Sequence, residues 1–188
     1  MVRNVVFAII VILASSKNAA CQYFGKVGDT VNLDELNIYF HRVIARHIGT
    51  KAPDYQFALS SGKLITNENT KGKVQVFLIW EPSDTMFATR PFCPILELAN
   101  KDTNLIFAAI ITDTSGLTLR PRCSSGAIPY AVTKQLIHER FEFRLGYPNF
   151  VIVGKNGTIA NIITAVDFRM YKEPTYEALA ESIERMLQ

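Results

Sequence analysis

A short apolar run, followed by a polar loop and one cysteine, constrains the fold of this chain more than any other feature. Lys73 to Trp80 contains mostly apolar residues and is rich in Val, Ile and Phe. Such a run is typical of a strand that is buried on both faces of a helix-covered sheet. After the loop from Glu81 to Pro91, Cys93 and Pro94 open a helical pattern. Because α/β folds place their chemistry where a buried strand leads into a helix, Cys93 is the first candidate functional residue.

The length and composition predict one well-buried domain with an extension. The chain has 188 residues, of which 48% are hydrophobic, and this is enough for a single core. The net charge is +3, but without Arg3 and Lys17 near the start, 18 basic side chains stand against 17 acidic ones. This balance argues against nucleic acid as a partner. The three cysteines and three histidines lack the spacing of a zinc site, so no metal or cofactor is expected.

Residues 1–20 have the pattern of a signal peptide. Arg3 supplies a positive charge, Val5 to Ala14 forms a ten-residue apolar segment, and Ala19-Ala20 ends the stretch with small residues. The apolar segment is short for a membrane-spanning helix. The alternative is a bacterial lipoprotein signal, in which Cys21 carries a lipid anchor and two cysteines are left to pair. Either interpretation predicts export, to the periplasm or out of the cell, and an oxidising compartment.

Apolar periodicity and turn residues predict further elements along the chain. They are an amphipathic helix over 33–47, a hairpin over 57–66, a second buried strand over 104–112, a helix over 131–143, two strands joined by a type I′ turn at 155–158, and an amphipathic helix from 174. In the helix over 131–143, we expect Val132, Leu136 and Phe141 to point inward.

An ordered set of short motifs resembles the redoxin superfamily. Gly49 to Tyr55 has the pattern G-x-x-A-P-D-[FY], a turn then ends in Gly62-Lys63, and Lys71-Gly72-Lys73 leads into the strand that ends at Trp80. This superfamily contains the antioxidant peroxiredoxins of the AhpC/TSA type and exported thioredoxin-like thiol:disulfide oxidoreductases. The resemblance covers residues 48–188. It implies an α/β thioredoxin-like fold, with a central mixed sheet, helices on both faces and an N-terminal hairpin, to which the amphipathic pattern over 33–47 adds an extra N-terminal helix.

Together with the patterns before residue 48, the resemblance divides the chain into three parts, and it implies a special proline. The expected parts are a signal peptide over 1–20, an extension with an amphipathic helix over 21–47, and the thioredoxin-like domain over 48–188. Gly146 to Phe150 resembles the family's Gly-Thr-Pro-Thr-x-Phe stretch, in which the proline is cis and lies beside the active-site loop. Pro148 is therefore the cis-proline candidate.

The resemblance places the chemistry at Cys93. The Cys-x-x-Cys motif of thioredoxin-like reductases would fall at Asp84 and Phe87, so that motif is absent. Phe92-Cys93-Pro94 is similar to the stretch around the peroxidatic cysteine of peroxiredoxins. A thiol at the start of a helix faces the positive end of the helix dipole, and a nearby guanidinium favours the thiolate further. Cys93 is therefore the candidate reactive residue, and Arg90 the candidate electrostatic activator.

Cys123 is the candidate partner of Cys93. It lies in a polar loop after the second buried strand, between Arg122 and Ser124. It is predicted to be a resolving thiol, a surface thiol, or one half of a structural disulfide to Cys93. The predicted function is a thiol-based redox role, peroxiredoxin-like or thiol:disulfide oxidoreductase-like, with protein thiols, disulfides or peroxide as partners. The alternative is a non-catalytic redoxin-fold protein that binds a partner, with Cys93 and Cys123 buried or in a structural disulfide.

Overall fold

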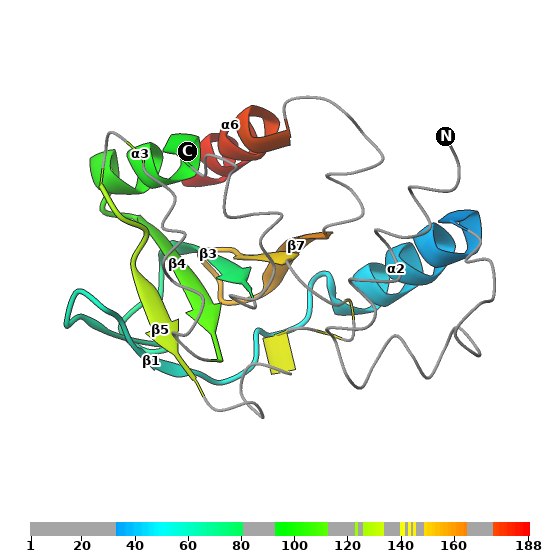
Figure 1. Ribbon diagram of the computed structural model, residues 1–188, viewed down its shortest axis with the longest axis horizontal. Coiled ribbons are helices and arrows are strands. Elements are labelled where there is room, and N and C mark those ends of the chain that lie inside the picture. The colour runs from blue at the N-terminus through cyan, green and yellow to red at the C-terminus, as the bar shows by residue number, and fades with distance from the viewer. Residues whose placement is uncertain are drawn as a thin grey trace.

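The apolar run that ends at Trp80 forms the central strand of a five-stranded mixed sheet. The structure is a computed structural model that describes residues 33–80, 93–112, 123, 126–133, 140–141, 143, 145, 149–164 and 175–188. The elements shown in Figure 1 are α2 (Leu33–His47), β1 (Gln56–Ala58), β2 (Leu64–Thr66), β3 (Val74–Ile79), α3 (Cys93–Lys101), β4 (Leu105–Ile111), β5 (Tyr130–Val132), β6 (Asn149–Val153), β7 (Ile159–Thr164) and α6 (Thr175–Leu187).

The strand order in the sheet is β5-β4-β3-β6-β7. Strand β3 runs parallel to β4, and β4 runs parallel to β5. Strand β6 is antiparallel to β3, and β7 is antiparallel to β6 at the sheet edge. Every residue of β3, β4 and β6 is buried. The two buried strands predicted from the sequence are therefore confirmed, and so is the mixed α/β sheet.

The two faces of the sheet pack against different elements. Alternate residues of β3 point to opposite faces, so Phe77 joins one hydrophobic cluster and Leu78 the other. The face of Phe77 is covered by the β1–β2 hairpin and by α2, and we call it the hairpin face. The face of Leu78 is covered by α3 and α6, which lie next to each other in Figure 1, and we call it the helix face.

An aromatic cluster fills the hairpin face. Neighbouring rings of Tyr55, Phe57, Phe77 and Phe141 have centroids 5.1 to 6.0 Å apart. The arrangement is mostly tilted or edge-to-face, which aromatic quadrupoles favour. All four side chains are buried, so this half of the core is closed and tightly packed.

A buried hydrogen-bond network accompanies these rings. The Tyr55 hydroxyl lies 2.5 Å from Thr70 Oγ1 and donates to Gln75 Oε1 at 2.6 Å. Gln75 Nε2 in turn donates to the carbonyl oxygens of Thr70 and Lys73. Burial raises the pKa of Tyr55, and the hydrogen bond with Thr70 opposes this rise. The network satisfies polar groups that would otherwise be costly to bury, and it ties the hairpin to β3.

Helix α2 spans the predicted residues and docks through the predicted face. Phe40 is buried, and Val43 and Ile44 pack half-buried against the hairpin-face cluster. The helix contacts β7. At its C-terminal end the His47 ring lies 4.5 Å from that of Phe143, centroid to centroid. The amphipathic pattern is thus confirmed where side chains are described.

The helix predicted over 131–143 is wrong at its start. Residues Tyr130 to Val132 form strand β5, and Val132 is 50% exposed instead of pointing inward. Pairing with β4, from Ala109↔Tyr130 onward, outweighs the helical spacing, because aromatic and β-branched residues favour strands. Phe141 is buried as predicted, and Leu136 lies outside the described residues.

The hairpin between β6 and β7 is confirmed, but its turn is not type I′. Type I′ requires positive φ at both central residues, and among these residues only Gly157 has it, at 78°. The Gly157 amide donates to the Gly154 carbonyl, and the Gly154 amide donates to the Thr158 carbonyl, both at 2.9 Å. This is a three-residue loop in which a type I turn precedes a left-handed glycine. The Asn156 Oδ1 accepts from the Thr158 amide at 3.1 Å and from the Thr158 hydroxyl at 2.8 Å, which further fixes the turn.

Candidate redox site

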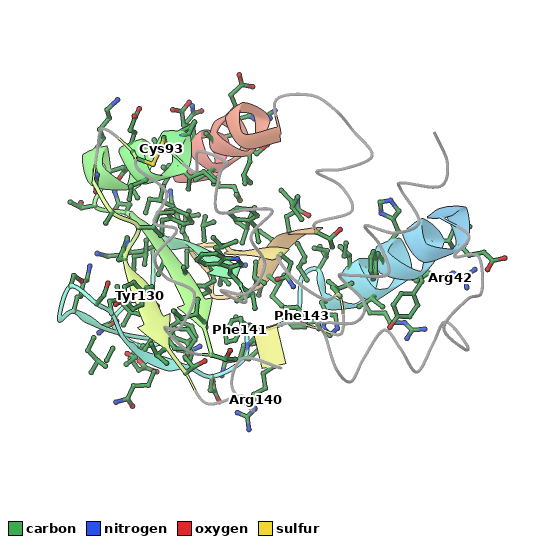
Figure 2. The ribbon with its side chains drawn as sticks, in the orientation of Figure 1. Arg42, Cys93, Tyr130, Arg140, Phe141 and Phe143 are labelled. Atoms are coloured by element: carbon green, nitrogen blue, oxygen red, sulfur yellow. A yellow bond between two sulfur atoms is a disulfide. The ribbon has the colours of Figure 1, made fainter. Side chains whose placement is uncertain are left out.

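The two cysteines that the sequence singles out are joined. Cys93, the first residue of α3, forms a disulfide with Cys123, and their Cα atoms are 5.2 Å apart. This separation lies within the ordinary range for disulfides. Figure 2 shows the sulfur–sulfur bond at α3, on the side of the molecule opposite to Arg42 of α2.

Strand β3 and helix α3 position Cys93. Strand β3 ends at Ile79, and the amide of the next residue, Trp80, donates to the Ile110 carbonyl of β4. Helix α3 then runs back across the helix face and buries Ile95 and Leu96. Cys93 is therefore held at the helix N-terminus, where free backbone amides create a positive potential.

A tight turn positions Cys123. The Gly126 amide donates to the Cys123 carbonyl at 3.1 Å, and Gly126 has a φ of 118°, which favours glycine. The chain then continues into β5, where the Pro129 carbonyl accepts from the Ala109 amide at 2.9 Å. The disulfide thus links α3 to the segment that enters the edge strand of the sheet.

Both sulfur-bearing residues are partly accessible. Cys93 and Cys123 are each half-buried, and Cys123 packs against the helix-face cluster together with Ile128 and Tyr130. A half-buried disulfide can be approached by a thiolate, whereas a fully enclosed one cannot. Reduction of this disulfide to two thiols would take up two electrons, and re-formation of the disulfide would release them.

The other predicted site residues lie outside the described residues. Arg90, the candidate activator, and Pro148, the cis-proline candidate, are in this group, as are Cys21 and the signal-peptide segment over 1–20. Within the described ranges, no group of three or more His, Cys, Asp and Glu side chains could hold a metal ion. None of the helices that the structure describes is both long and apolar enough to cross a bilayer.

A cleft beside the disulfide was not predicted from the sequence. Its volume is about 610 Å³, and it is lined by α3, the end of β3, β4, the segment that enters β5, and the tip of the β1–β2 hairpin. Its lining includes Gly126, which follows Cys123 by three residues, and Leu96, which lies one turn along α3 from Cys93. No local motif marks this cleft, because its walls come from five separate parts of the chain.

The sequence matches no protein-family model and no curated protein. Solved structures, however, share its architecture. A candidate protein disulfide isomerase from Bacteroides thetaiotaomicron is 22% identical with a TM-score of 0.55, and the match covers 74% of this chain and 89% of that one. A candidate thiol:disulfide interchange protein DsbE from Chlorobium tepidum is 19% identical with a TM-score of 0.55, over 75% of this chain and 98% of that one.

A third structure of the same kind is an exposed lipoprotein thioredoxin from Streptococcus pneumoniae. It is 12% identical, its TM-score is 0.52, and the match covers 71% of this chain and 99% of that one. At these identities the likeness concerns the arrangement of the backbone. The fold that the redoxin-like motifs predicted is therefore confirmed, and this chain has a thioredoxin-like α/β fold.

Proposed function

We propose that the protein is a thiol:disulfide redox protein whose reversible centre is the Cys93–Cys123 pair. The observation that carries this proposal is the disulfide between the first residue of α3 and the loop before β5. It provides the second thiol that the absent Cys-x-x-Cys motif would otherwise supply. The thioredoxin-like fold, which the structures named above share, supports the same role.

The proposed exchange needs no cofactor, because the two cysteines and an external dithiol supply all the electrons that it moves. In the reduced protein, the Cys93 thiolate attacks a client disulfide, so that a bond forms to one client sulfur and the other leaves as a thiolate. The Cys123 thiolate then attacks Cys93 Sγ, restores the Cys93–Cys123 bond and releases the second client thiol. Two electrons pass to the client, and an external dithiol must reduce the pair before the next cycle. The reverse sequence oxidises a client dithiol.

The geometry supports Cys93 as the attacking residue. Its place at the N-terminus of α3 favours a thiolate at this position. Cys123 lies in a turn and packs against the core, which suits a resolving thiol. We further propose that Arg90 strengthens the thiolate and that Pro148 is a cis-proline beside the site.

A half-buried disulfide in a chain whose first 20 residues have a signal-peptide pattern supports export to an oxidising compartment. We propose cleavage after residue 20, with lipidation of Cys21 as the alternative. Mass spectrometry of the protein from an expressing bacterium separates these outcomes. A free Cys21 supports ordinary cleavage, a diacylglyceryl adduct supports the anchor, and an intact N-terminus contradicts both.

The exchange is tested by trapping. In Cys123→Ser, Cys93 lacks its resolving partner and should accumulate a mixed disulfide with a peptide that contains one disulfide bond. Cys93→Ser is the matched control and should trap no adduct at the same position. Mass spectrometry without reductant measures both. If neither variant forms an adduct, and the wild-type bond resists dithiothreitol under native conditions, the pair is a structural disulfide and the non-catalytic alternative holds.

A peroxidase activity is a more specific version of the proposed redox role, carried out by the same two cysteines. In that reaction the Cys93 thiolate takes one peroxide oxygen to become a sulfenic acid, an alcohol or water leaves, and the Cys123 thiol condenses with the sulfenic acid to give the disulfide and water. The half-buried pair supports this order. Peroxide consumption by the reduced protein should be lost in Cys93→Ser. Equal background rates in both proteins would remove this role and leave thiol exchange.

A further inference from the structure

The cleft beside the disulfide has the size and lining of a site for a small molecule. Its volume of about 610 Å³ lies within the range of ordinary ligand sites. Its floor is apolar, because Leu78 of β3, Leu96 of α3 and Phe107 of β4 are buried members of the helix-face cluster. Its walls include apolar side chains that are only half-buried, such as Ala99 on α3 and Ile128 before β5. Both the floor and the walls favour a hydrocarbon group.

Polar residues of the lining come mainly from the tip of the β1–β2 hairpin. Ser60, Ser61 and Lys63 are exposed residues of this tip, and Asn100 of α3 adds one amide. Lys63 is the one charged residue among the described lining residues, and it forms no ion pair with a described carboxylate. The described lining contains no aspartate or glutamate. An anionic group at the hairpin tip would therefore be attracted by Lys63 and would meet no like charge from the lining.

Hydrogen bonds fix the backbone of this tip beside the cleft. The Leu59 amide donates to the Lys63 carbonyl at 2.9 Å, and the Gly62 amide donates to the Leu59 carbonyl at 2.8 Å. The φ of Gly62 is 82°, a value that favours glycine. The Ser60 amide donates to the Tyr130 carbonyl at 2.7 Å, and the Tyr130 amide donates to Ser60 Oγ at 3.1 Å. The backbone at the charged end is thus already ordered, which lowers the entropic cost of binding.

We propose that the cleft binds the anion of a fatty acid, with its hydrocarbon chain on the apolar floor and its carboxylate paired with Lys63. The lining offers hydrocarbon contact together with a positive charge at one end. An amphipathic anion matches both features, whereas an amphipathic cation would be repelled by Lys63. This site goes beyond the proposed redox function, and its ligand uses neither Cys93 nor Cys123.

The single tryptophan of the chain provides a readout of binding. Trp80 lines the cleft and is 4% exposed, so a bound hydrocarbon chain should change its emission. The probes are decanoate, decyltrimethylammonium, which has the same chain length and the opposite charge, and butanoate, which has the same head group on a short chain. Each is titrated into the oxidised full chain, and Trp80 fluorescence and calorimetric heat are followed.

Decanoate should give a saturable signal below the concentration at which it forms micelles. Butanoate should bind about 100-fold more weakly, because it buries six fewer CH₂ groups. Decyltrimethylammonium should bind about ten-fold more weakly, because an exposed lysine contributes a modest charge effect. Absence of a saturable decanoate signal in both measurements overturns the site, and equal binding of decanoate and decyltrimethylammonium overturns the anionic ligand.

Substitutions locate the bound anion. Lys63→Gln should weaken decanoate binding about three-fold, whereas Lys71→Gln, at an exposed position outside the lining, should leave it unchanged. Ala99→Phe should weaken binding about ten-fold, because the ring occupies space that the ligand needs. Ala127→Phe, on the exposed rim, makes the same test from the opposite wall if Ala99→Phe does not fold. Unchanged decanoate affinity in a folded variant of either alanine overturns the proposal.

Discussion

The two faces of the sheet are formed by the same strands but are covered by different elements and different kinds of side chain. On the hairpin face, four aromatic rings and the Tyr55 network close the core. On the helix face, α3 and α6 cover mainly aliphatic residues, and beside them lie a disulfide and an open cleft. The difference indicates that the hairpin face holds the fold together, while the helix face can retain a partly open site because the other face stabilises the sheet.

Neighbouring residues of β3 give the sharpest test of this contrast. Both Phe77 and Leu78 are buried, but Phe77 meets the aromatic cluster and Leu78 borders the cleft. Phe77→Ala should lower the free energy of unfolding by about 3–5 kcal/mol. Leu78→Ala should cost about 2–3 kcal/mol, at the low end for such changes, because the space it leaves joins an existing cleft. Urea unfolding measures both, and a larger loss for Leu78→Ala would contradict the contrast.

The disulfide should be the main covalent support of the helix face. It spans a sequence separation of 30 residues, and its removal in Cys123→Ser should cost roughly 3–4 kcal/mol in the chain-entropy description. Urea unfolding of the wild type with and without dithiothreitol measures the same quantity. The reductant should leave the midpoint of the variant unchanged. A wild-type midpoint that is also insensitive to reductant would show that the bond adds nothing to stability.

On the hairpin face, the polar network should contribute less than the rings around it. Tyr55→Phe keeps the ring but removes the hydroxyl that contacts Thr70 and Gln75. We expect a loss of about 1–3 kcal/mol, because buried polar groups lose a partner. Chemical unfolding checks the value, and Tyr39→Phe on α2, where the ring is half-buried, is a useful comparison. A change within error would mean that water replaces the hydroxyl.

The smallest effect should come from His47 at the outer end of the hairpin face. Burial lowers the pKa of His47 below 6.5, and the nearby Arg46 charge lowers it further. The unfolded chain therefore binds this proton more readily, so its contribution to stability is present above pH 6.5 and is lost as the pH falls through the lowered folded value. Urea midpoints at pH 5 and pH 8 should differ less in His47→Gln than in the wild type. An identical pH dependence would contradict this assignment.

The sequence by itself determined the elements whose signals are local. The apolar runs of β3 and β4, the amphipathic spacing of α2 and the Asn156-Gly157 turn are each contained in a few consecutive residues. It also singled out both cysteines, and the order of its short motifs indicated the thioredoxin-like fold. These features depend on neighbouring side chains and backbone preferences, which a linear pattern records.

Only the tertiary structure decided the features that join distant residues. Residues 130–132 form a strand because they pair with β4. The positive φ of Gly157 determines the type of the turn between β6 and β7. The bond between Cys93 and Cys123 and the cleft beside it depend on how α3, β4 and the segment that enters β5 pack together. Such contacts depend on three-dimensional proximity and strand register, and the spacing of residues along the chain determines neither of them.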